Sequence, residues 1–99
     1  MIIVTGTALA SEDTFEEVLT LSLEHVERSR AEPGCLSHAV HIDCEDERRL
    51  VFVERWADRE ALTQHFQKRE SRDFVRALRG LLAEPSTLEI YQAEPLQMT

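Results

Sequence analysis

Cysteine, glycine, proline and tryptophan are all scarce in this sequence, which has 99 residues but two cysteines, three glycines, three prolines and one tryptophan. So little glycine and proline, beside 42% hydrophobic and 30% charged residues, excludes fibrous and disordered chains and favours a globular domain. No apolar run approaches the roughly 18 residues that a membrane-spanning helix needs. The N-terminal MIIVTGTALA also lacks the basic start and long apolar stretch of a secretory signal peptide, so we do not expect it to be one.

The two cysteines, Cys35 and Cys44, are not expected to form a disulfide with each other. On one strand, their separation of nine residues places the thiols roughly 30 Å apart and on opposite faces. Reduced thiols are typical of a cytoplasmic protein, which is the localisation we expect. Without a Cys-x-x-Cys or a His-x-x-x-His pair, the sequence predicts no metal site.

Basic residues are outnumbered by acidic ones, 11 to 19, and the formal net charge is −8. Nucleic acids and anionic membranes both bind clustered positive charge, so neither is expected as a partner. The acidic excess lies mainly in residues 1–34, whereas residues 50–83 contain more bases than acids. A stripe of arginines in the second region is either a solvated face, a partner for the acidic first helix or a contact for an anionic substrate tail. Its members are Arg69, Arg72, Arg76 and Arg79.

The spacing of apolar residues predicts alternating strands and helices within one domain, residues 1–99. Gly34 suits the left-handed turn that follows the first helix, and the acidic segment 44–48 reads as a turn between two strands. Asp58 is a suitable N-cap for a second helical region, which the charged segment 67–71 interrupts. The expected strands are 2–9, 35–43, 49–56 and 86–94, and the expected helices run from 11–14 to about 31 and on either side of 67–71 up to Gly80.

The resulting order, β-α-β-β-α-β, is that of a ferredoxin-like α+β fold with an antiparallel sheet. One face of the third strand carries Leu50, Phe52 and Trp56. The other face carries Val51 and Val53, so both faces are largely apolar. Helices usually cover one face of such a sheet, and we expect a second copy of the chain to cover the other, giving a homodimer.

A glutamate interrupts the first of these faces, since Glu54 lies between Phe52 and Trp56 at period two. An ionised carboxylate on a buried face is costly unless it is paired. One interpretation pairs Glu54 with an arginine or a helix N-terminus, which makes its role structural. The other has it orient His65, nine residues after Trp56, or a substrate hydroxyl. Histidine titrates near neutral pH and suits a general base, but a lone histidine on a helical stripe is also a common core residue.

The remaining histidines are expected to differ in their surroundings. His38 shares a strand face with apolar residues and points to the same cavity as Glu54, whereas His41 points to the opposite face and to a dimer contact. His25, in the first helix, is expected at the surface. Tryptophan is most often a core residue, although at a pocket wall it can also stack on an aromatic ligand. The candidate substrate-binding residues are Trp56, His38, Phe52 and Phe66.

The segments EPGCLSH, VERWADREALTQHF and FVRALRG resemble the antibiotic biosynthesis monooxygenase family, and the likeness covers nearly the whole chain. The shared elements are the turn at Gly34 and Cys35, the pair Glu54 and Trp56, and the later His65. The resemblance implies a dimeric α+β barrel with a pocket between sheet and helices in each protomer. It also implies catalysis without metal, flavin or other cofactor, in which a phenol anion passes an electron directly to molecular oxygen.

For this chain, the resemblance implies a monooxygenase that oxidises a quinol or polycyclic phenol, with His65 as the catalytic base and Glu54 orienting it. Three positions depart from the family pattern. Glu70 stands where many members have a second histidine, and His38 stands where a tyrosine is common. Val75 stands where haem-degrading relatives have the proximal histidine, which argues against haem.

Two other functions are compatible with the predicted order of elements. The first is a non-catalytic or regulatory dimer that binds a small apolar molecule on the same scaffold. The second is an RNA-recognition module, which shares the β-α-β-β-α-β order. The third strand, RLVFVERW, lacks the basic-Gly-aromatic pattern whose rings stack on bases, and the net charge is negative. We therefore retain the binding dimer as the alternative to the enzyme.

Overall fold

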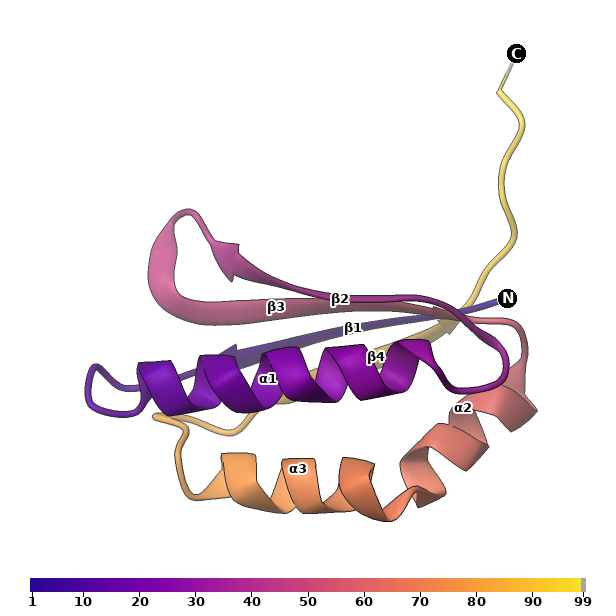
Figure 1. Ribbon diagram of the computed structural model, residues 1–99. Helices are drawn as coiled ribbons and strands as arrows, with labels where there is room; N and C mark the ends of the chain where they lie inside the picture. The colour runs from indigo at the N-terminus through magenta and orange to yellow at the C-terminus, as the bar shows by residue number, and fades with distance from the viewer. Residues whose placement is uncertain (99) are drawn as a thin grey trace.

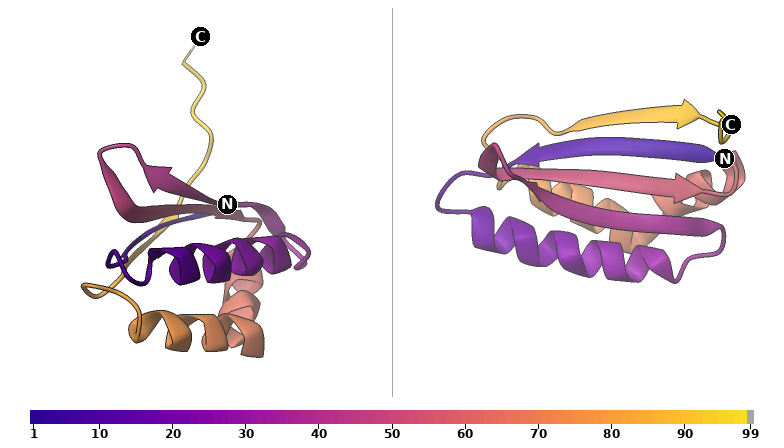
Figure 2. Two further views of the ribbon diagram at one scale, coloured as in Figure 1. Left: turned by 60° about the vertical axis from the view of Figure 1, so that its left-hand side comes forward. Right: turned by 90° about the horizontal axis from the view of Figure 1, so that it is seen from above.

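Four antiparallel strands form a sheet, and three helices cover one of its faces (Figures 1 and 2). The computed structural model describes residues 1–98. Its elements are β1 (Ile2–Leu9), α1 (Phe15–Arg30), β2 (Cys35–Asp43), β3 (Asp46–Trp56), α2 (Arg59–Gln67), α3 (Arg69–Arg79) and β4 (Thr87–Gln92). The strands lie in the order β2-β3-β1-β4. This arrangement is the ferredoxin-like α+β fold that the sequence predicts.

Most element boundaries match the expected ones, and β3 is the main exception. It begins at Asp46 rather than at residue 49. A tight turn at Cys44 and Glu45 is enough to reverse the chain, because the side chain of Asp43 accepts a hydrogen bond from the Glu45 amide at 2.9 Å. The predicted break in the second helical region lies at Lys68, whose extended backbone (ψ 134°) separates α2 from α3.

The turn between α1 and β2 packs closely against the first turn of α2. Gly34 has a φ of +81°, a left-handed value that side chains disfavour. A Cβ atom built at this position would lie 2.5 Å from the Cβ of Ala61. Asp58 caps α2 by accepting a hydrogen bond from the Ala61 amide at 2.9 Å, as predicted, and this bond holds Ala61 in place. Both backbone conformation and space therefore require glycine at residue 34.

We expect Gly34→Ala to lower the free energy of unfolding by about 2 kcal/mol, because it adds a strained φ and an overpacked contact. Gly80→Ala is the matched control. Gly80 has a φ of −84°, and the nearest atom to an added Cβ, the backbone oxygen of Ala77, would lie 3.9 Å away. Urea unfolding followed by circular dichroism gives both values. Equal midpoints for the two variants would contradict this account of the turn.

The core lies between the sheet and the helices and divides into two apolar clusters. The larger cluster packs α1 and α3 against β1 and β3, and the smaller one packs α2 against the same two strands. The buried members of the larger cluster are Ala8, Ala10, Val18, Val26, Leu50, Phe52, Phe74 and Leu78. Those of the smaller are Ile2, Val4, Trp56, Ala61 and Leu62.

Two predictions about helix faces are wrong. His25, expected at the surface, is only 6% exposed, because it lies one helical turn from the buried Ser22 and Ser29 and shares their face of α1. The spacing of apolar residues also predicts Val75 in the core stripe of α3, together with Phe74 and Leu78, but Val75 is 46% exposed. Phe74 takes the inward position of that turn, and a rotation of about 100° per residue turns the next side chain away from it.

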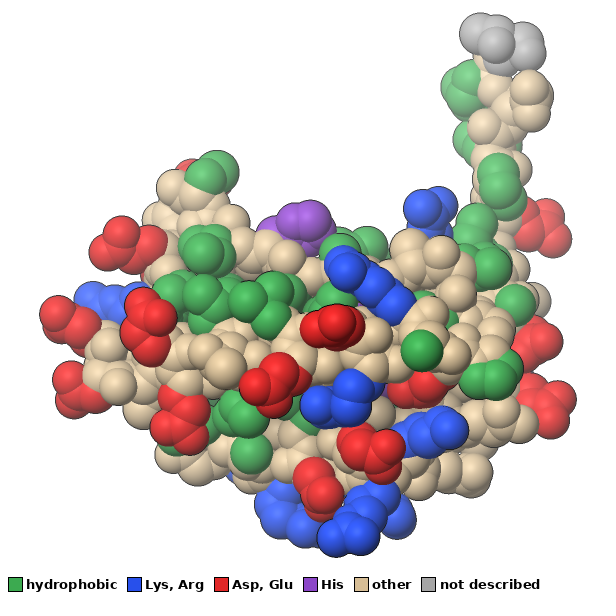
Figure 3. All heavy atoms as spheres, in the orientation of Figure 1, with side chains coloured by type: hydrophobic (Ala, Val, Ile, Leu, Met, Phe, Trp, Pro, Cys, Tyr) green, Lys and Arg blue, Asp and Glu red, His purple; other side chains and the backbone are tan. Residues whose placement is uncertain are grey.

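The face of the sheet opposite the helices has no element over it within residues 1–98 (Figure 1). Val53 points to this face and is 37% exposed, while Val51 and Ala39 beside it are partly buried. Hydrophobic side chains are visible along this layer in Figure 3. Within residues 1–98, no helix is both long and apolar enough to cross a membrane.

Candidate active site

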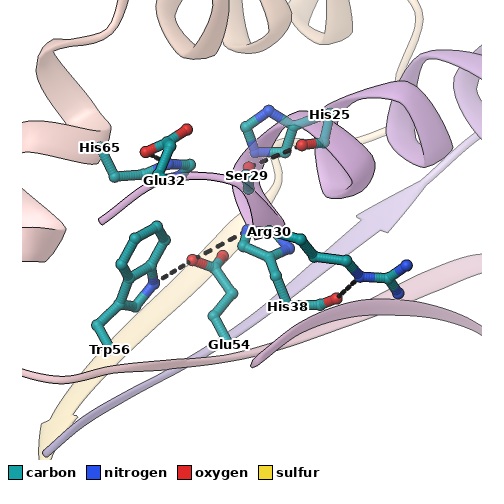
Figure 4. Close-up of polar contacts among 8 residues, drawn as sticks. All are labelled: His25, Ser29, Arg30, Glu32, His38, Glu54, Trp56 and His65. Atoms are coloured by element: carbon teal, nitrogen blue, oxygen red, sulfur yellow. Dashed lines mark hydrogen bonds and ion pairs between the residues drawn. The ribbon is translucent and has the colours of Figure 1, made fainter. Parts of the chain in front are cut away.

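A group of buried polar side chains lies between the helices and the inner face of the sheet (Figure 4). Its members come from four elements: His25 from α1, His38 from β2, Glu54 and Trp56 from β3, and His65 from α2. Each of these side chains belongs to a residue at most 6% exposed. Buried polar groups of this kind require partners, so the contacts of each residue indicate what it does.

Glu54 is held by its two neighbours on the sheet. Its Oε1 accepts a hydrogen bond from Trp56 Nε1 at 2.9 Å and lies 3.2 Å from His38 Nε2. Period two places Trp56 on the same face, and the antiparallel register sets His38 directly opposite Glu54. Its partners are thus a histidine and a tryptophan, rather than the arginine or helix N-terminus that the structural interpretation named.

The charge of Glu54 is favoured in spite of its burial. Burial raises the pKa of the carboxyl group, but the contact with His38 and the N–H of Trp56 lower it further than burial raises it. The pKa of Glu54 therefore lies below its ordinary value, and the group is ionised at neutral pH. The carboxylate of Glu54 therefore places a negative charge between the sheet and the helices.

His65 has a different carboxylate partner from the one expected. Its Nδ1 lies 3.0 Å from Oε1 of Glu32, in the turn after α1, and its ring lies 4.6 Å from that of Trp56. Glu54 does not contact it directly. Glu32 was not predicted from the sequence, because a glutamate in a turn has no periodic neighbour that would mark it as buried. The only signal was its position in the EPGCLSH segment.

His25 faces two other imidazoles of the group from α1. Its ring centroid lies 5.3 Å from those of His38 and His65, and the ring stacks on Phe74 at 4.1 Å. Burial, followed by the charges of His38 and His65, lowers the pKa of His25 to about 3. The imidazole of His25 is therefore neutral at physiological pH. The three- and four-residue spacing of Ser22, His25 and Ser29 was the signal that could have identified it.

His38 is the least satisfied member of the group. Its backbone oxygen accepts a hydrogen bond from Arg30 Nε at 2.9 Å, which ties the end of α1 to β2. Its Nε2 lies 3.2 Å from Oε1 of Glu54 without forming a hydrogen bond to it. Within residues 1–98, neither ring nitrogen of His38 has a hydrogen-bond partner. A buried polar atom without a partner is uncommon in folded proteins.

A cavity of about 390 Å³ opens beside this group, between the sheet and α3. Glu54, His65 and His25 line it together with Phe52 and Phe66. Four of the residues proposed from the sequence therefore line one cavity: Glu54, His65, Phe52 and Phe66. Trp56 and His38, also proposed as substrate-binding residues, are not among the lining residues and instead contact Glu54.

The outer part of the cavity is basic. Lys and Arg side chains gather over α3 at the bottom of Figure 3, and Arg72, Arg76 and Arg79 line the cavity. Arg76 also lies 3.5 Å from Asp73 on the same helix. The arginine stripe therefore serves partly as the cavity rim and partly as a solvated surface with local ion pairs.

Three imidazoles of the group could hold a metal ion, although the sequence predicts none. His25, His38 and His65 each offer a ring nitrogen, and these nitrogens lie within 4.8 Å of one another. The three residues are far apart in the sequence and on three different elements, so no spacing motif revealed them. Neutral imidazole is a common ligand of transition metals.

Comparison with known proteins identifies related sequences and structures. A model of the antibiotic biosynthesis monooxygenase family matches residues 1–77. The uncharacterized protein sll1783 of Synechocystis sp. is 36% identical over 96 residues, which are 97% of this chain and 65% of that protein. The chain thus spans less than two thirds of the length of this relative.

Solved structures agree with the fold. A crystal structure of an antibiotic biosynthesis monooxygenase has a TM-score of 0.88 and 29% identity, covering 96% of this chain and all of the other. PA3566 from Pseudomonas aeruginosa has a TM-score of 0.85 and 26% identity, over 95% and 94% of the two chains. A protein from Deinococcus radiodurans, at 24% identity, reaches a TM-score of 0.93 over 100% and 99% and shows the same fold.

Proposed function

Because the chain belongs to the antibiotic biosynthesis monooxygenase family, we propose that it is a monooxygenase that oxidises a quinol or polycyclic phenol with molecular oxygen. The observation that carries the proposal is that His65 and the ionised Glu54 both line one largely apolar cavity. An aromatic substrate fits the phenylalanine side chains there, and its hydroxyl group meets an acid–base pair.

In the proposed reaction, His65 takes the phenolic proton. Its Nδ1 is engaged by Glu32, so Nε2 is the atom that receives the proton. Glu54 supplies a nearby negative charge that stabilises the imidazolium once it forms, and Trp56 with His38 keeps that carboxylate in place. The phenolate then reduces dioxygen. One oxygen atom enters the ring and the other leaves as water, with all electrons supplied by the substrate.

Oxygen uptake with a panel of quinols tests the proposal against its alternative. A dimer that only binds a small apolar molecule would bind members of the panel without consuming oxygen. The expected result is uptake that saturates with one or more quinols and is lost in His65→Gln. Absence of uptake with every quinol that binds would overturn the oxygenase and favour the binding protein.

The proposed chemistry needs no bound cofactor, so we expect oxygen uptake to survive removal of metals. Treatment with EDTA followed by desalting should not lower kcat/KM for the quinol by more than about twofold, which corresponds to about 0.4 kcal/mol. An apoenzyme control that regains activity on addition of iron or copper would contradict a cofactor-free reaction.

We also propose that the open face of the sheet joins two copies of the chain. Val53→Asp places a charge on this face, and we expect at least about a tenfold weaker dimer, or about 1.4 kcal/mol, because the carboxylate is desolvated without a partner. Leu23→Asp is the matched control, since Leu23 is 52% exposed on α1. Sedimentation velocity across a concentration series measures both. A wild-type monomer at all concentrations would contradict the dimer.

A further inference from the structure

The buried histidines form a compact group that acid–base chemistry alone does not require. One base and one carboxylate are enough for the proposed reaction, yet three imidazoles converge from α1, β2 and α2 (Figure 4). A ring nitrogen of each lies within 4.8 Å of a ring nitrogen of the other two. All three residues are buried, at 6%, 2% and 3% exposure for His25, His38 and His65.

We propose that His25, His38 and His65 together bind one divalent transition-metal ion, of the class of Zn²⁺ or Co²⁺. Three imidazoles with an open fourth position are a common ligand set for such ions. Zinc–nitrogen bonds of about 2.0–2.1 Å in tetrahedral geometry hold the nitrogens roughly 3.3 Å apart. The nitrogens, which lie within 4.8 Å of one another, would therefore approach by up to about 1.5 Å when the ion binds.

The unpartnered ring of His38 is the first independent support. Its two nitrogens are buried and have no hydrogen-bond partner within residues 1–98. Such an atom loses its hydration without compensation, which costs free energy of folding. A metal ion would give one of these nitrogens a strong partner. The neutral form that a ligand must adopt is also the form that burial of an imidazole favours.

The carboxylates behind the histidines are the second support. Glu32 lies 3.0 Å from Nδ1 of His65. Metal-binding histidines commonly donate their second ring N–H to a carboxylate in this way, which orients the ring and strengthens it as a ligand. Glu54, whose Oε1 lies 3.2 Å from Nε2 of His38 without a hydrogen bond between them, adds a second negative charge. Two carboxylates beside the group also offset the charge of a divalent cation.

The cavity gives the site its open position. His25 and His65 both line it, so an ion held by the three rings would face a space large enough for water or a small ligand. A metal on His65 would also occupy the nitrogen that the proposed reaction needs for a proton. Zn²⁺ should therefore reduce oxygen uptake. This consequence rests on the proposed function, but the binding of the metal does not depend on it.

Co²⁺ provides a direct probe of the site. Full-length protein, treated with EDTA and desalted, is titrated with Co²⁺ while visible d–d absorption is recorded. We expect saturation at one Co²⁺ per chain and displacement by one equivalent of Zn²⁺. His25→Gln should weaken binding at least a hundredfold. His41→Gln is the matched control, because His41 is exposed on β2 and outside the group, and it should bind like wild type.

Wild-type protein supplies a readout that does not depend on the folding of a variant. The chain has four histidines, and Zn²⁺ should shift the ring ¹⁵N resonances of three of them in NMR spectra while that of His41 stays unchanged. Absence of a saturable cobalt band, or equal loss of binding in His25→Gln and His41→Gln, would overturn the site. Oxygen uptake by the EDTA-treated protein is measured separately, so failure of the metal site and failure of the proposed oxygenase are distinguishable.

Discussion

Replacing Glu54 with glutamine should lower the turnover of a quinol substrate by well over tenfold, or more than about 1.4 kcal/mol of transition-state stabilisation. Glutamine keeps the shape of the side chain, and its oxygen can still accept the hydrogen bond from Trp56 Nε1. What it removes is the negative charge beside His38 and near His65. His65 becomes positively charged when it takes the phenolic proton. Loss of the nearby negative charge therefore destabilises the state formed by proton transfer and not the complex with bound substrate.

The measurement is kcat and KM for oxygen uptake, with the melting temperature of each variant recorded beside them. Glu60→Gln is the control. Glu60 is exposed in the first turn of α2, so this substitution removes the same charge without altering the site. If Glu54 is a structural residue only, its replacement will lower the melting temperature and leave turnover per folded molecule nearly unchanged. That outcome would contradict the role assigned to it here.

The fold was largely predictable because its signals are local. Alternation along β3 placed Leu50, Phe52 and Trp56 on the inner face, and all three are buried. The cap at Asp58 and the left-handed Gly34 were likewise visible as single residues with strong conformational preferences. The same alternation identified Glu54 as a carboxylate on an apolar face, which was the most useful functional signal in the sequence.

The partners within the site were not predictable in the same way, because they depend on contacts between distant segments. His65 pairs with Glu32 across 33 positions of sequence, where the α1–β2 turn meets α2. Only the packing of three elements brings these side chains together. His25 was misplaced for a different reason: a polar residue was assigned to the surface although its helical spacing from Ser22 and Ser29 already favoured the inner face.

His25 should make the protein lose stability as the pH falls, by about 1.4 kcal/mol for each pH unit at the steepest. Its pKa is about 3 in the folded chain, against an ordinary value of 6.5. Between these two values the unfolded chain binds a proton at this residue and the folded chain does not. Stability therefore rises with pH through this window and is unaffected by His25 above it. By about pH 3.5 the loss approaches roughly 4 kcal/mol.

The groups that face His25 determine how cleanly this slope can be measured. They are His38, His65, Glu54, Arg28 and Phe74. The pKa of Glu54 is also lowered in the folded chain, so its ionised form adds stability that is lost as the pH falls through that lowered value. Glu54 thus acts in the same direction as His25, but in a more acidic range. The interval above the ordinary carboxyl pKa of 4.5 therefore reports mainly on the histidines.

His25→Gln separates the contribution of His25 from those of its neighbours. Glutamine is neutral at every pH, so the unfolded variant binds no proton at this position. Any loss of packing caused by the substitution is the same at every pH and does not change the slope. The free energy of unfolding is measured with urea, in EDTA-containing buffers, between pH 4.5 and 6.5. It should fall less steeply with decreasing pH for this variant than for wild type or His41→Gln. A slope equal to that of wild type would mean that His25 is already able to accept a proton in the folded protein, and that the three imidazoles share their protons instead of keeping one ring neutral.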